Sequence, residues 1–338
     1  MKTQPNIAPL VRDRVSLELA VHRAISEFLN IPPEQIITRP NKEKYYDPDR
    51  PESVDQGLQE VFSIMRDLNL RGLEDRDLCR SEAGGMSFLE ALQAVVQDFI
   101  DMAPQTPVHY VELGPEPIKT TEILQRLVEG GVQIRSYTAL DINPVSKFVM
   151  DSCIRRFVAA EKINHVTADY FTLSDLGIED DGARALVTML GFQEGNETPY
   201  KIMNFFRKFV RPGDTLLAEM QLLSTANWLP IFRFYGSEQM RRFSKLSLQR
   251  TMGNLESEYG VVLVPVPMEI LGSGFVAATT ERIRSDGNLN GKIVVTNYCI
   301  KYTEEEFRRL REFDRGFHVV SQRVTGDGSV GFQLAERC

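Results

Sequence analysis

The sequence contains few of the residues that bind metal ions. Four cysteines and four histidines occur among its 338 residues, and no two cysteines form a C-x-x-C pair. The cysteines lie far apart in the chain, and the histidines do not have the spacing of metal ligands. Zinc sites usually draw their ligands from short, regularly spaced pairs of such residues. We therefore expect no metal centre.

Long hydrophobic runs and an excess of basic charge are also missing. No stretch of about 18 apolar residues could cross a membrane, and the first residues, Met1 to Pro5, contain no apolar signal core. Acidic side chains number 47 and basic ones 39, which gives a net charge of -8. A protein whose main partner is nucleic acid needs a concentrated basic face. We therefore predict a cytoplasmic protein that binds neither a membrane nor nucleic acid.

The composition is otherwise that of an ordinary globular protein. Hydrophobic residues make up 42% of the chain and charged residues 25%, close to the average for soluble domains. A chain of this length is too long for one ordinary core. We expect two domains, or one large domain that carries an insertion.

Apolar strands alternate with helical patterns through the middle of the chain. Strands are expected at residues 108–113, 134–140, 165–168, 185–190 and 215–220. Helical patterns separate them, and this alternation is typical of an α/β fold. The sequence therefore predicts a doubly wound, Rossmann-like parallel sheet.

The alternation stops after Met220. A helical stretch is expected at residues 225–259, and two strands at 268–282 and 292–302 are expected to form a hairpin. The pair Thr303 and Glu306 then has the spacing of a capping box, which predicts the start of another helix.

Two closing strands, at residues 318–322 and 329–335, are expected to return to the main sheet. We therefore predict a core domain of residues 80–224 and 303–338, and a second α+β lobe of residues 1–79 and 225–302. Ligands in such folds lie above the carboxyl ends of the strands.

The turn after the first strand is the most informative feature. Glu112-Leu113-Gly114 ends that strand, and Asp141 ends the next one, where a carboxylate can accept hydrogen bonds from ribose hydroxyls. The turn continues with Pro115 and Glu116 rather than with the glycines of a phosphate-binding loop. A cofactor without phosphates, such as S-adenosylmethionine, fits this turn better than a dinucleotide. An ordinary βαβ unit without a ligand is the alternative.

Two further segments follow predicted strands. Asp169 and Tyr170 offer an acceptor for an adenine amino group and an adjacent aromatic ring, although Asp169 could instead cap the next turn. The segment Leu190-Gly191-Phe192-Gln193-Glu194-Gly195-Asn196-Glu197-Thr198-Pro199 places polar side chains between two glycines, close to where a transferred group would lie. A plain loop before the next helix is the alternative for this segment.

These residues resemble the histidine-specific S-adenosylmethionine-dependent methyltransferases, which include the histidine Nα-methyltransferase of ergothioneine biosynthesis. The family's first turn, E-L-G-S-G-T-S-E-K-T, is similar to residues 112–120, and its L-G-S-T-I-G-N-L-T-P segment is similar to residues 190–199. Its P-G-D-x-L-L-L and T-E-V-S-C-K-F segments correspond to residues 212–218 and 296–302. The resemblance runs from about Val111 to the C-terminus and keeps the order of the segments.

The resemblance implies a class I methyltransferase core that binds S-adenosylmethionine and a second lobe that binds the substrate. It implies that the cofactor is lined by Gly114, Lys119, Asp141, Asp169 and Tyr170. Asn196 and Tyr235 would hold the amino and carboxylate groups of an amino-acid substrate and position it for the reaction. Tyr45 and Tyr46, in a loop at residues 39–52, are candidates for the family's tyrosine-rich segment.

Two departures from the family pattern bear on the substrate and on the cofactor. The glutamate and serine that read the imidazole in the family are Asn297 and Cys299 here. The loss of a charge-assisted hydrogen bond, which contributes about 1.5 to 3 kcal/mol, predicts that histidine is a poor substrate. In the shortened first turn, Glu116 replaces a glycine, and its carboxylate either points away from the cofactor or is neutralised by Lys119.

We therefore expect a small-molecule methyltransferase of specialised metabolism. N-methylation of an amino acid or amine with an aromatic or apolar side chain is the first hypothesis, with a pocket supplied by Trp228, Phe232, Phe234 and Met268. An O- or C-methyltransferase of an indolic or prenylated metabolite, and a non-catalytic cofactor-binding protein, are the alternatives. The missing glycines disfavour a nicotinamide-dependent oxidoreductase. The sequence predicts no oligomeric state.

Overall fold

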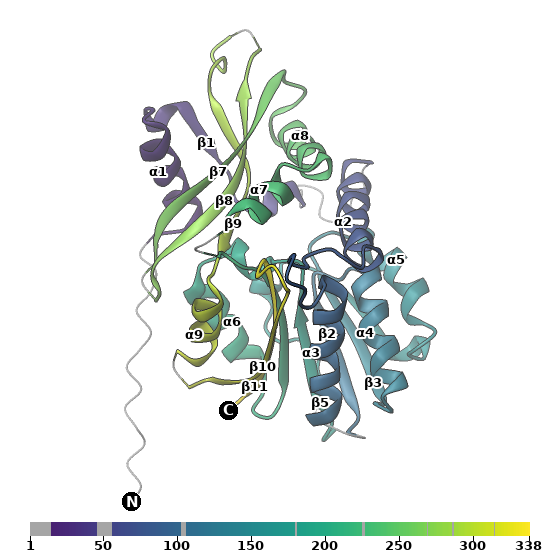
Figure 1. Ribbon diagram of the computed structural model, residues 1–338. Helices are drawn as coiled ribbons and strands as arrows, with labels where there is room; N and C mark the ends of the chain where they lie inside the picture. The colour runs from purple at the N-terminus through teal and green to yellow at the C-terminus, as the bar shows by residue number, and fades with distance from the viewer. Residues whose placement is uncertain are drawn as a thin grey trace, which may run out of the picture.

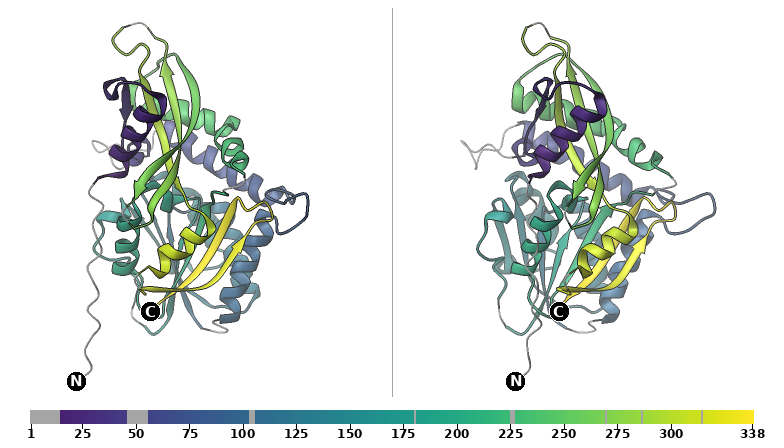
Figure 2. Two further views of the ribbon diagram at one scale, coloured as in Figure 1. Left: turned by 60° about the vertical axis from the view of Figure 1, so that its left-hand side comes forward. Right: turned by 90° about the vertical axis from the view of Figure 1, so that its left-hand side faces the viewer.

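Two sheets, one above the other in Figure 1, make up the protein. The computed structural model describes residues 15–45, 56–102, 106–179, 181–224, 227–268, 270–285, 287–313 and 315–338. Both views of Figure 2 show the smaller sheet standing over one edge of the larger one. No helix in these residues is both long enough and apolar enough to span a bilayer.

The larger sheet has seven strands in the order β10-β11-β6-β5-β2-β3-β4. Its strands are β2 (Val108–Leu113), β3 (Ile134–Asp141), β4 (Ile163–Thr167), β5 (Arg184–Met189), β6 (Thr215–Gln221), β10 (Phe317–Val324) and β11 (Val330–Arg337). Strands β2 to β6 run parallel to one another, and β11 is antiparallel to both β6 and β10. The predicted doubly wound sheet is confirmed, including the return of the two closing strands.

Helices cover both faces of this sheet. On one face lie α3 (Phe88–Met102), α4 (Pro117–Glu129) and α5 (Val145–Ile154), and on the other lie α6 (Pro199–Phe209) and α9 (Glu304–Glu312). All six residues of β2 are buried because both faces of the strand are covered. A strand buried on both faces is a continuous apolar run in the sequence. The predicted capping box is present at the start of α9.

The smaller sheet has four strands in the order β1-β9-β8-β7. They are β1 (Ile36–Thr38), β7 (Ser257–Met268), β8 (Gly272–Ile283) and β9 (Ile293–Lys301). The N-terminal strand β1 is parallel to β9, and the other neighbours are antiparallel. Residues far apart in the sequence therefore share one sheet, although the division of the chain into two domains remains a prediction.

Four helices pack around or beneath the smaller sheet. They are α1 (Leu17–Leu29), α2 (Gln56–Glu74), α7 (Leu229–Tyr235) and α8 (Glu238–Met252). Helix α1 packs on β7, and α8 packs on β8 and β9. Helix α2 contacts α8 above and both α4 and α5 below, so it links the two sheets through their helices.

The predicted helix at residues 225–259 is wrong in extent. Its first part ends at Tyr235, and Ser237 then caps α8 by accepting a hydrogen bond from the Met240 backbone. Helix α8 ends at Met252 because Gly253 takes a positive φ of 86°. Serine and glycine at these positions are ordinary helix boundary residues.

Strand β7 is missing from the sequence prediction, whereas the predicted hairpin is confirmed as the antiparallel pair β8 and β9, with a first strand that starts four residues later than expected. Met268 ends β7 rather than starting the hairpin, which is formed by β8 and β9. Pro265 and Pro267 disfavour a strand in the sequence, because proline cannot donate a hydrogen bond to a neighbouring strand. They are tolerated here because β7 is at the edge of its sheet.

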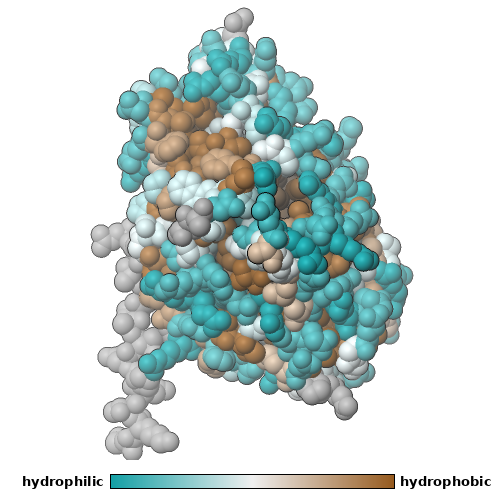
Figure 3. Space-filling view, viewed as in Figure 1, coloured by the Kyte–Doolittle hydropathy of each residue, from teal (hydrophilic) through white to brown (hydrophobic). Residues whose placement is uncertain are grey.

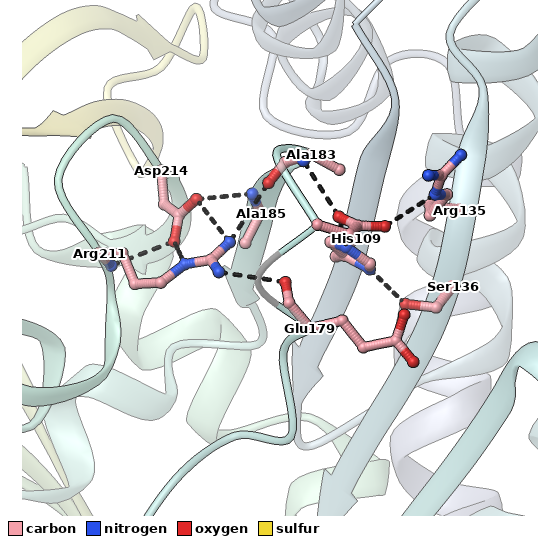
Figure 4. Close-up of polar contacts among 9 residues, drawn as sticks. His109, Arg135, Ser136, Glu179, Ala183, Ala185, Arg211 and Asp214 are labelled. Carbon is pink, nitrogen blue, oxygen red and sulfur yellow. Dashed lines mark hydrogen bonds and ion pairs between the residues drawn. The ribbon is translucent and has the colours of Figure 1, made fainter.

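Polar residues join the amino-terminal ends of the parallel strands (Figure 4). The ring nitrogens of His109 lie 2.7 Å from Ser136 Oγ and 2.9 Å from Asp181 Oδ1. In the same region Asp214 Oδ1 accepts a hydrogen bond of 2.7 Å from the Ala185 backbone and pairs with Arg211. These contacts fasten the edge of the sheet opposite to the predicted site. Among the described residues, no cluster of histidine, cysteine and acidic side chains could hold a metal ion.

Candidate functional site

The carboxyl ends of β2 to β5 face the smaller sheet. Gly114 follows β2, Asp141 ends β3, Asp169 follows β4, and the loop at residues 190–199 follows β5. A bridge between Leu222, just past the end of β6, and Tyr302, just past the end of β9, joins this edge to the smaller sheet. The predicted cofactor and substrate residues therefore surround the junction between the two sheets.

Gln193 covers the first turn. Gly114 has a positive φ of 67°, and the Gln193 side chain donates hydrogen bonds of 3.1 Å to the carbonyl oxygens of Leu113 and Gly114. A Cβ atom on Gly114 would lie 2.1 Å from Gln193 Nε2, so a larger residue would displace this side chain, and the positive φ also favours glycine. The Tyr170 hydroxyl donates to Gln193 Oε1 over 3.3 Å. Gln193 thus links two of the predicted cofactor residues.

The carboxylate of Glu116 caps helix α4. It accepts hydrogen bonds of 2.8 Å from the Ile118 backbone and 2.9 Å from the Lys119 backbone. These are the N–H groups that would otherwise bind an anion at the start of the helix. The Glu116 carboxylate is thus directed toward its own helix α4, which corresponds to the first of the two predicted arrangements. Burial raises the pKa of Glu116, and the charge of Lys119 opposes that rise.

Lys119 is buried and forms an ion pair below the turn. Its Nζ lies 2.5 Å from Glu219 Oε2, and the same carboxylate oxygen accepts a 2.9 Å hydrogen bond from the Gly191 backbone. Lys119 therefore ties α4 to β6 and to the start of the 190–199 loop. A direct contact between Lys119 and the cofactor stays a prediction.

Asp141 and Asp169 each use one oxygen for a local backbone contact. Asp141 Oδ1 accepts 3.0 Å from the Asn143 backbone, and burial raises the pKa of Asp141 to about 6. Asp169 Oδ1 accepts 3.1 Å from the Phe171 backbone, which is the capping role that the sequence left open. Its second oxygen pairs with Lys42 Nζ at 3.2 Å. Contacts with the adenine and ribose stay predictions.

The loop at residues 190–199 is held at several points. Phe192 takes a left-handed φ of 63°, which is uncommon for a residue other than glycine. Glu194 forms an ion pair with Arg311 of α9, and both side chains are fully buried. A Cβ atom on Gly195 would lie 2.5 Å from Cys299 Sγ. These contacts fix the position of the loop, and a role of the loop in binding a substrate stays a prediction.

Two of the predicted substrate residues lie near each other. Burial raises the pKa of Tyr235 well above its ordinary value, and the nearby Cys299 thiol raises it further. Cys299 Sγ in turn donates to the Phe192 carbonyl oxygen over 3.4 Å. Asn297 lies two residues earlier on β9, and side chains at this spacing share one face of a strand.

Asn196 contacts a different partner. Its Oδ1 accepts a hydrogen bond of 3.4 Å from Asn41 Nδ2, and Asn41 also donates 2.7 Å to the Tyr298 carbonyl oxygen. Asn41 belongs to the short helix Asn41–Lys44, as does Lys42, the partner of Asp169. This short helix therefore connects the loop after β5, the end of β4 and strand β9.

Tyr45 lies next to both groups of predicted residues. Its ring packs on Phe243 with a centroid distance of 6.0 Å. The pKa of Tyr45 is raised first by burial and then by the nearby Asp141 and Cys299. Tyr46 and residues 47–55 lie outside the described residues.

The four residues expected to form an apolar pocket do not lie together. Phe234 packs edge-on against Phe192 with a ring-centre distance of 5.6 Å, while Trp228, just before α7, and Phe232 of α7 are exposed. Met268 instead lines a groove of about 530 Å³ between α1 and β7. Figure 3 shows apolar side chains gathered over α1 and the adjoining strands. Ile300 lines that groove, so the groove is on the opposite face of β9 from Cys299.

Several residues of the site were not singled out from the sequence. They are Asn41, Lys42, Gln193, Glu219, Lys301 and Arg311. Gln193 lies within a segment that the sequence did identify, and its polar side chain between two glycines was the available signal. The others reach the site through contacts between distant parts of the chain, for which no local pattern exists.

Comparisons with known proteins return similar structures but no similar sequences. No protein-family model matches the chain, and no curated protein matches it. The CcbJ methyltransferase from Streptomyces caelestis is 12% identical, with a TM-score of 0.38, over 79% of this chain and 96% of that one. An S-adenosylmethionine-dependent methyltransferase from Clostridium acetobutylicum is 10% identical, with a TM-score of 0.39, over 73% and 91%.

A third similar structure is a putative methyltransferase in complex with the Trm112 methyltransferase activator of Haloferax volcanii. It is 13% identical, with a TM-score of 0.41, over 84% of this chain and 99% of that one. Likenesses of this size do not identify the activity of this chain. Its function has to be argued from its own site.

Proposed function

We propose that this protein is an S-adenosylmethionine-dependent methyltransferase that methylates the nitrogen of a small amine or amino acid with an aromatic or apolar side chain. The observation that carries the proposal is the convergence of Gly114, Asp141, Tyr170 and the 190–199 loop on one edge of the sheet, opposite Tyr235 and Cys299. Open α/β sheets bind their ligands at this edge.

The residues at this edge fit a cofactor that carries no phosphate. Asp141 offers a carboxylate for the ribose hydroxyls, and Tyr170 offers a ring beside the adenine position. Glu116 already occupies the backbone N–H groups at the start of α4, which removes the anion site that a diphosphate would need. When bound, S-adenosylmethionine would supply an electrophilic methyl group on its sulfonium.

The catalytic task of the protein would be to position the acceptor nitrogen. A displacement at a methyl group needs the nucleophile in line with the breaking bond, and positioning of this kind can supply about 7 to 11 kcal/mol. We assign this role to Asn196 and Tyr235. Their amide and hydroxyl groups can orient an amine without acting as strong bases.

Uncharged residues at the predicted position of the substrate side chain support a substrate other than histidine. Asn297 and Cys299 are both nearly fully buried, at 8% and 4% exposure. Neither offers the carboxylate that an imidazole N–H would pair with. Phe192 and Phe234 pack edge-on beside Cys299 and supply an apolar wall. We therefore place an aromatic or apolar substrate side chain here, as suits specialised metabolism.

A methyl-transfer assay with a panel of amines tests the proposal. Purified protein and labelled S-adenosylmethionine should methylate tryptophan-like or other aromatic amines and leave histidine almost unmethylated. Asn297→Glu should gain histidine activity, because it restores a charge-assisted partner for the imidazole. The control Asn164→Glu, on the exposed face of β4, should gain none. Equal activity of the unchanged protein on histidine and aromatic amines would contradict the proposed pocket.

Two alternatives give different results in the same assay. An O- or C-methyltransferase of an indolic or prenylated metabolite would place the label on oxygen or carbon, which fragment mass spectrometry localises. A non-catalytic cofactor-binding protein is motivated by the altered first turn, in which Glu116 caps helix α4. It would bind S-adenosylmethionine in calorimetry and transfer no methyl group to any acceptor.

A further inference from the structure

The side chain of Gln193 lies directly on the turn after β2. Its Nε2 carries two hydrogens and donates hydrogen bonds of 3.1 Å to the carbonyl oxygens of Leu113 and Gly114. The position that a Cβ atom would take on Gly114 is 2.1 Å from Nε2 and 2.6 Å from Cδ of Gln193. The Gln193 amide therefore fills the space that the missing side chain of Gly114 leaves open.

This space is the one through which a ligand reaches the turn. Glycine after the first strand of such a sheet lets a ligand approach the backbone closely, and Gly114 is one of the predicted cofactor residues. Heavy atoms that are not bonded to each other keep about 3.5 to 4.0 Å apart. The Gln193 amide and a cofactor that touches Gly114 therefore cannot occupy this space together.

The backbone on both sides of Gln193 is held in place. Glu194, the next residue, forms the fully buried ion pair with Arg311. Two residues before Gln193, the Gly191 N–H donates a hydrogen bond of 2.9 Å to Glu219 Oε2. A movement that uncovers the turn is therefore a rotation of the Gln193 side chain rather than a displacement of the loop.

The Gln193 side chain itself is held only by bonds between uncharged groups. Besides its two bonds to the turn, it accepts a hydrogen bond from the Tyr170 hydroxyl over 3.3 Å, which is long for two oxygens. Such bonds contribute little net stability, because water can replace them. Gln193 is only partly buried, so its amide can exchange these partners for water when the side chain rotates.

We propose that the Gln193 side chain is an autoinhibitory contact, which must rotate away from Gly114 before S-adenosylmethionine binds at this turn. The inference rests on the proposed methyltransferase function, and in particular on its cofactor. The rotation also frees the hydroxyl of Tyr170, a second predicted cofactor residue, because Gln193 Oε1 is its acceptor. One side chain thus controls two of the predicted cofactor contacts.

Calorimetry with the demethylated cofactor, and without any methyl acceptor, tests the inference. A site that is open in only a fraction of the molecules binds with an affinity reduced by that fraction. Gln193→Ala should therefore bind about 5- to 30-fold more tightly than the unchanged protein. The control Gln125→Ala, on the exposed face of α4, should bind as the unchanged protein does.

A second variant separates the hydrogen bonds from the shape of the side chain. Gln193→Met keeps the length of the side chain but donates no hydrogen bond to the turn, so it should also bind the demethylated cofactor more tightly. Urea unfolding checks that both variants are folded. An affinity equal to that of the unchanged protein in the folded variants would overturn the proposal. A weaker affinity would also overturn it and would show that Gln193 contributes to cofactor binding.

A crystal structure with the demethylated cofactor observes the rotation directly. The Gln193 amide should lie beyond hydrogen-bond distance of the Leu113 and Gly114 carbonyl oxygens, and the backbone of the 190–199 loop should be unchanged. A bound cofactor with the amide still on Gly114 would contradict the proposal.

The binding results also distinguish this inference from the proposed function. If the unchanged protein binds the demethylated cofactor and the Gln193 variants bind it no more tightly, the inference fails alone. Binding by the variants and not by the unchanged protein would support the inference. If none of these proteins binds the demethylated cofactor, the proposed function fails and takes this inference with it.

Discussion

At the scale of single residues, the contacts of Thr120 indicate that the buried carboxyl group of Glu112 is protonated. Its Oγ1 lies 2.5 Å from Glu112 Oε1 and 2.6 Å from the Glu116 carbonyl oxygen. One hydroxyl carries one hydrogen and can donate to only one of these acceptors. A proton on Glu112 resolves the conflict, since the acid can then donate to Thr120. In agreement, burial raises the pKa of Glu112 to about 7.

Glu112→Gln should remove the loss of folding stability that accompanies the ionisation of Glu112. The pKa of Glu112 is about 7 in the folded protein against 4.5 as the ordinary value. The folded state therefore holds its proton more tightly, and stability falls by about 3 kcal/mol as the pH rises through this range. A glutamine donates to Thr120 and accepts from Tyr137, as the protonated acid does.

Urea unfolding at about pH 4 and about pH 8 checks this prediction. The variant should match the unchanged protein at the lower pH and exceed its stability at the higher pH. The exposed control Glu161→Gln should change neither value. The same loss of stability with pH in the variant and the unchanged protein would count against a protonated Glu112.

Asp141 should make the affinity for the cofactor rise with pH, whereas ionisation of Glu112 makes the stability fall with pH. Only its ionised form offers both oxygens to ribose hydroxyls, and burial raises its pKa to about 6. The affinity for S-adenosylmethionine should therefore fall as the pH drops through that value. Asp141→Asn should weaken binding by about 10- to 100-fold and abolish the pH dependence.

Calorimetry with demethylated cofactor between about pH 5 and about pH 8 measures both effects. Asp101→Asn, an exposed change on α3, is the matched control and should bind as the unchanged protein does. An affinity that Asp141→Asn leaves unaltered would remove this residue from the cofactor site.

At the scale of elements, the ion pair between Glu194 and Arg311 fixes the loop after β5 to helix α9. Both side chains are fully buried, and the Arg311 guanidinium also lies 4.9 Å from the ring centre of Phe206. Removing one member of a buried pair leaves the other charge without compensation. The ion pair therefore couples helix α9 to the loop that carries Asn196.

Arg311→Met should lower the free energy of unfolding by about 3 to 5 kcal/mol. The double variant Glu194→Gln/Arg311→Met should recover most of this loss, because no buried charge remains. Arg308→Met, which breaks an exposed pair with Glu312 on the same helix, should cost at most about 1 kcal/mol. Denaturant unfolding of the four proteins measures the coupling, and additive losses would show that the pair does not act as a unit.

The elements differ in how well the sequence predicts them. Strands β2 and β5 are apolar runs because helices cover both faces, and the sequence places them within one residue. Strand β7 is half exposed and carries two prolines, so its pattern is that of an irregular segment. Local patterns thus predict the buried parallel sheet and miss an edge strand whose stability comes from its neighbour.

The residues of the candidate site also differ in how well the sequence predicts their positions. Gly114, Asp141 and the 190–199 loop follow strands directly, and their position at the sheet edge is a consequence of the strand pattern. Whether they bind the cofactor is a separate question that stays a prediction. The contacts of Lys301 and Arg311 join residues more than 60 positions apart, and the sequence carries no local sign of them.

At the scale of the whole molecule, Asn41 holds the two sheets together. It donates to the Tyr298 carbonyl oxygen and accepts from the Tyr298 backbone in one sheet, and it donates to Asn196 at the edge of the other. Asn41→Ala should lower the free energy of unfolding by about 1 to 3 kcal/mol. It should also speed proteolysis between the sheets, because the short helix Asn41–Lys44 loses its main attachment.

Thermal unfolding and limited proteolysis measure the two effects of Asn41→Ala. Asn164→Ala, an exposed asparagine on the edge strand β4, is the control and should leave both unchanged. Normal stability together with normal proteolysis in Asn41→Ala would show that other contacts join the sheets.

Strand order also dictates when the protein can fold as it is made. Strand β1 is made early but pairs with β9. Asn41 likewise cannot donate its hydrogen bond to Tyr298 until that residue, 257 positions later in the chain, has been made. In the other sheet, β6 gains its outer neighbour only when β11, the last strand of the chain, is complete. Long-range pairings of this kind form slowly and expose strand edges meanwhile. We therefore expect the nascent chain to depend on chaperones until β9 and β11 have been made.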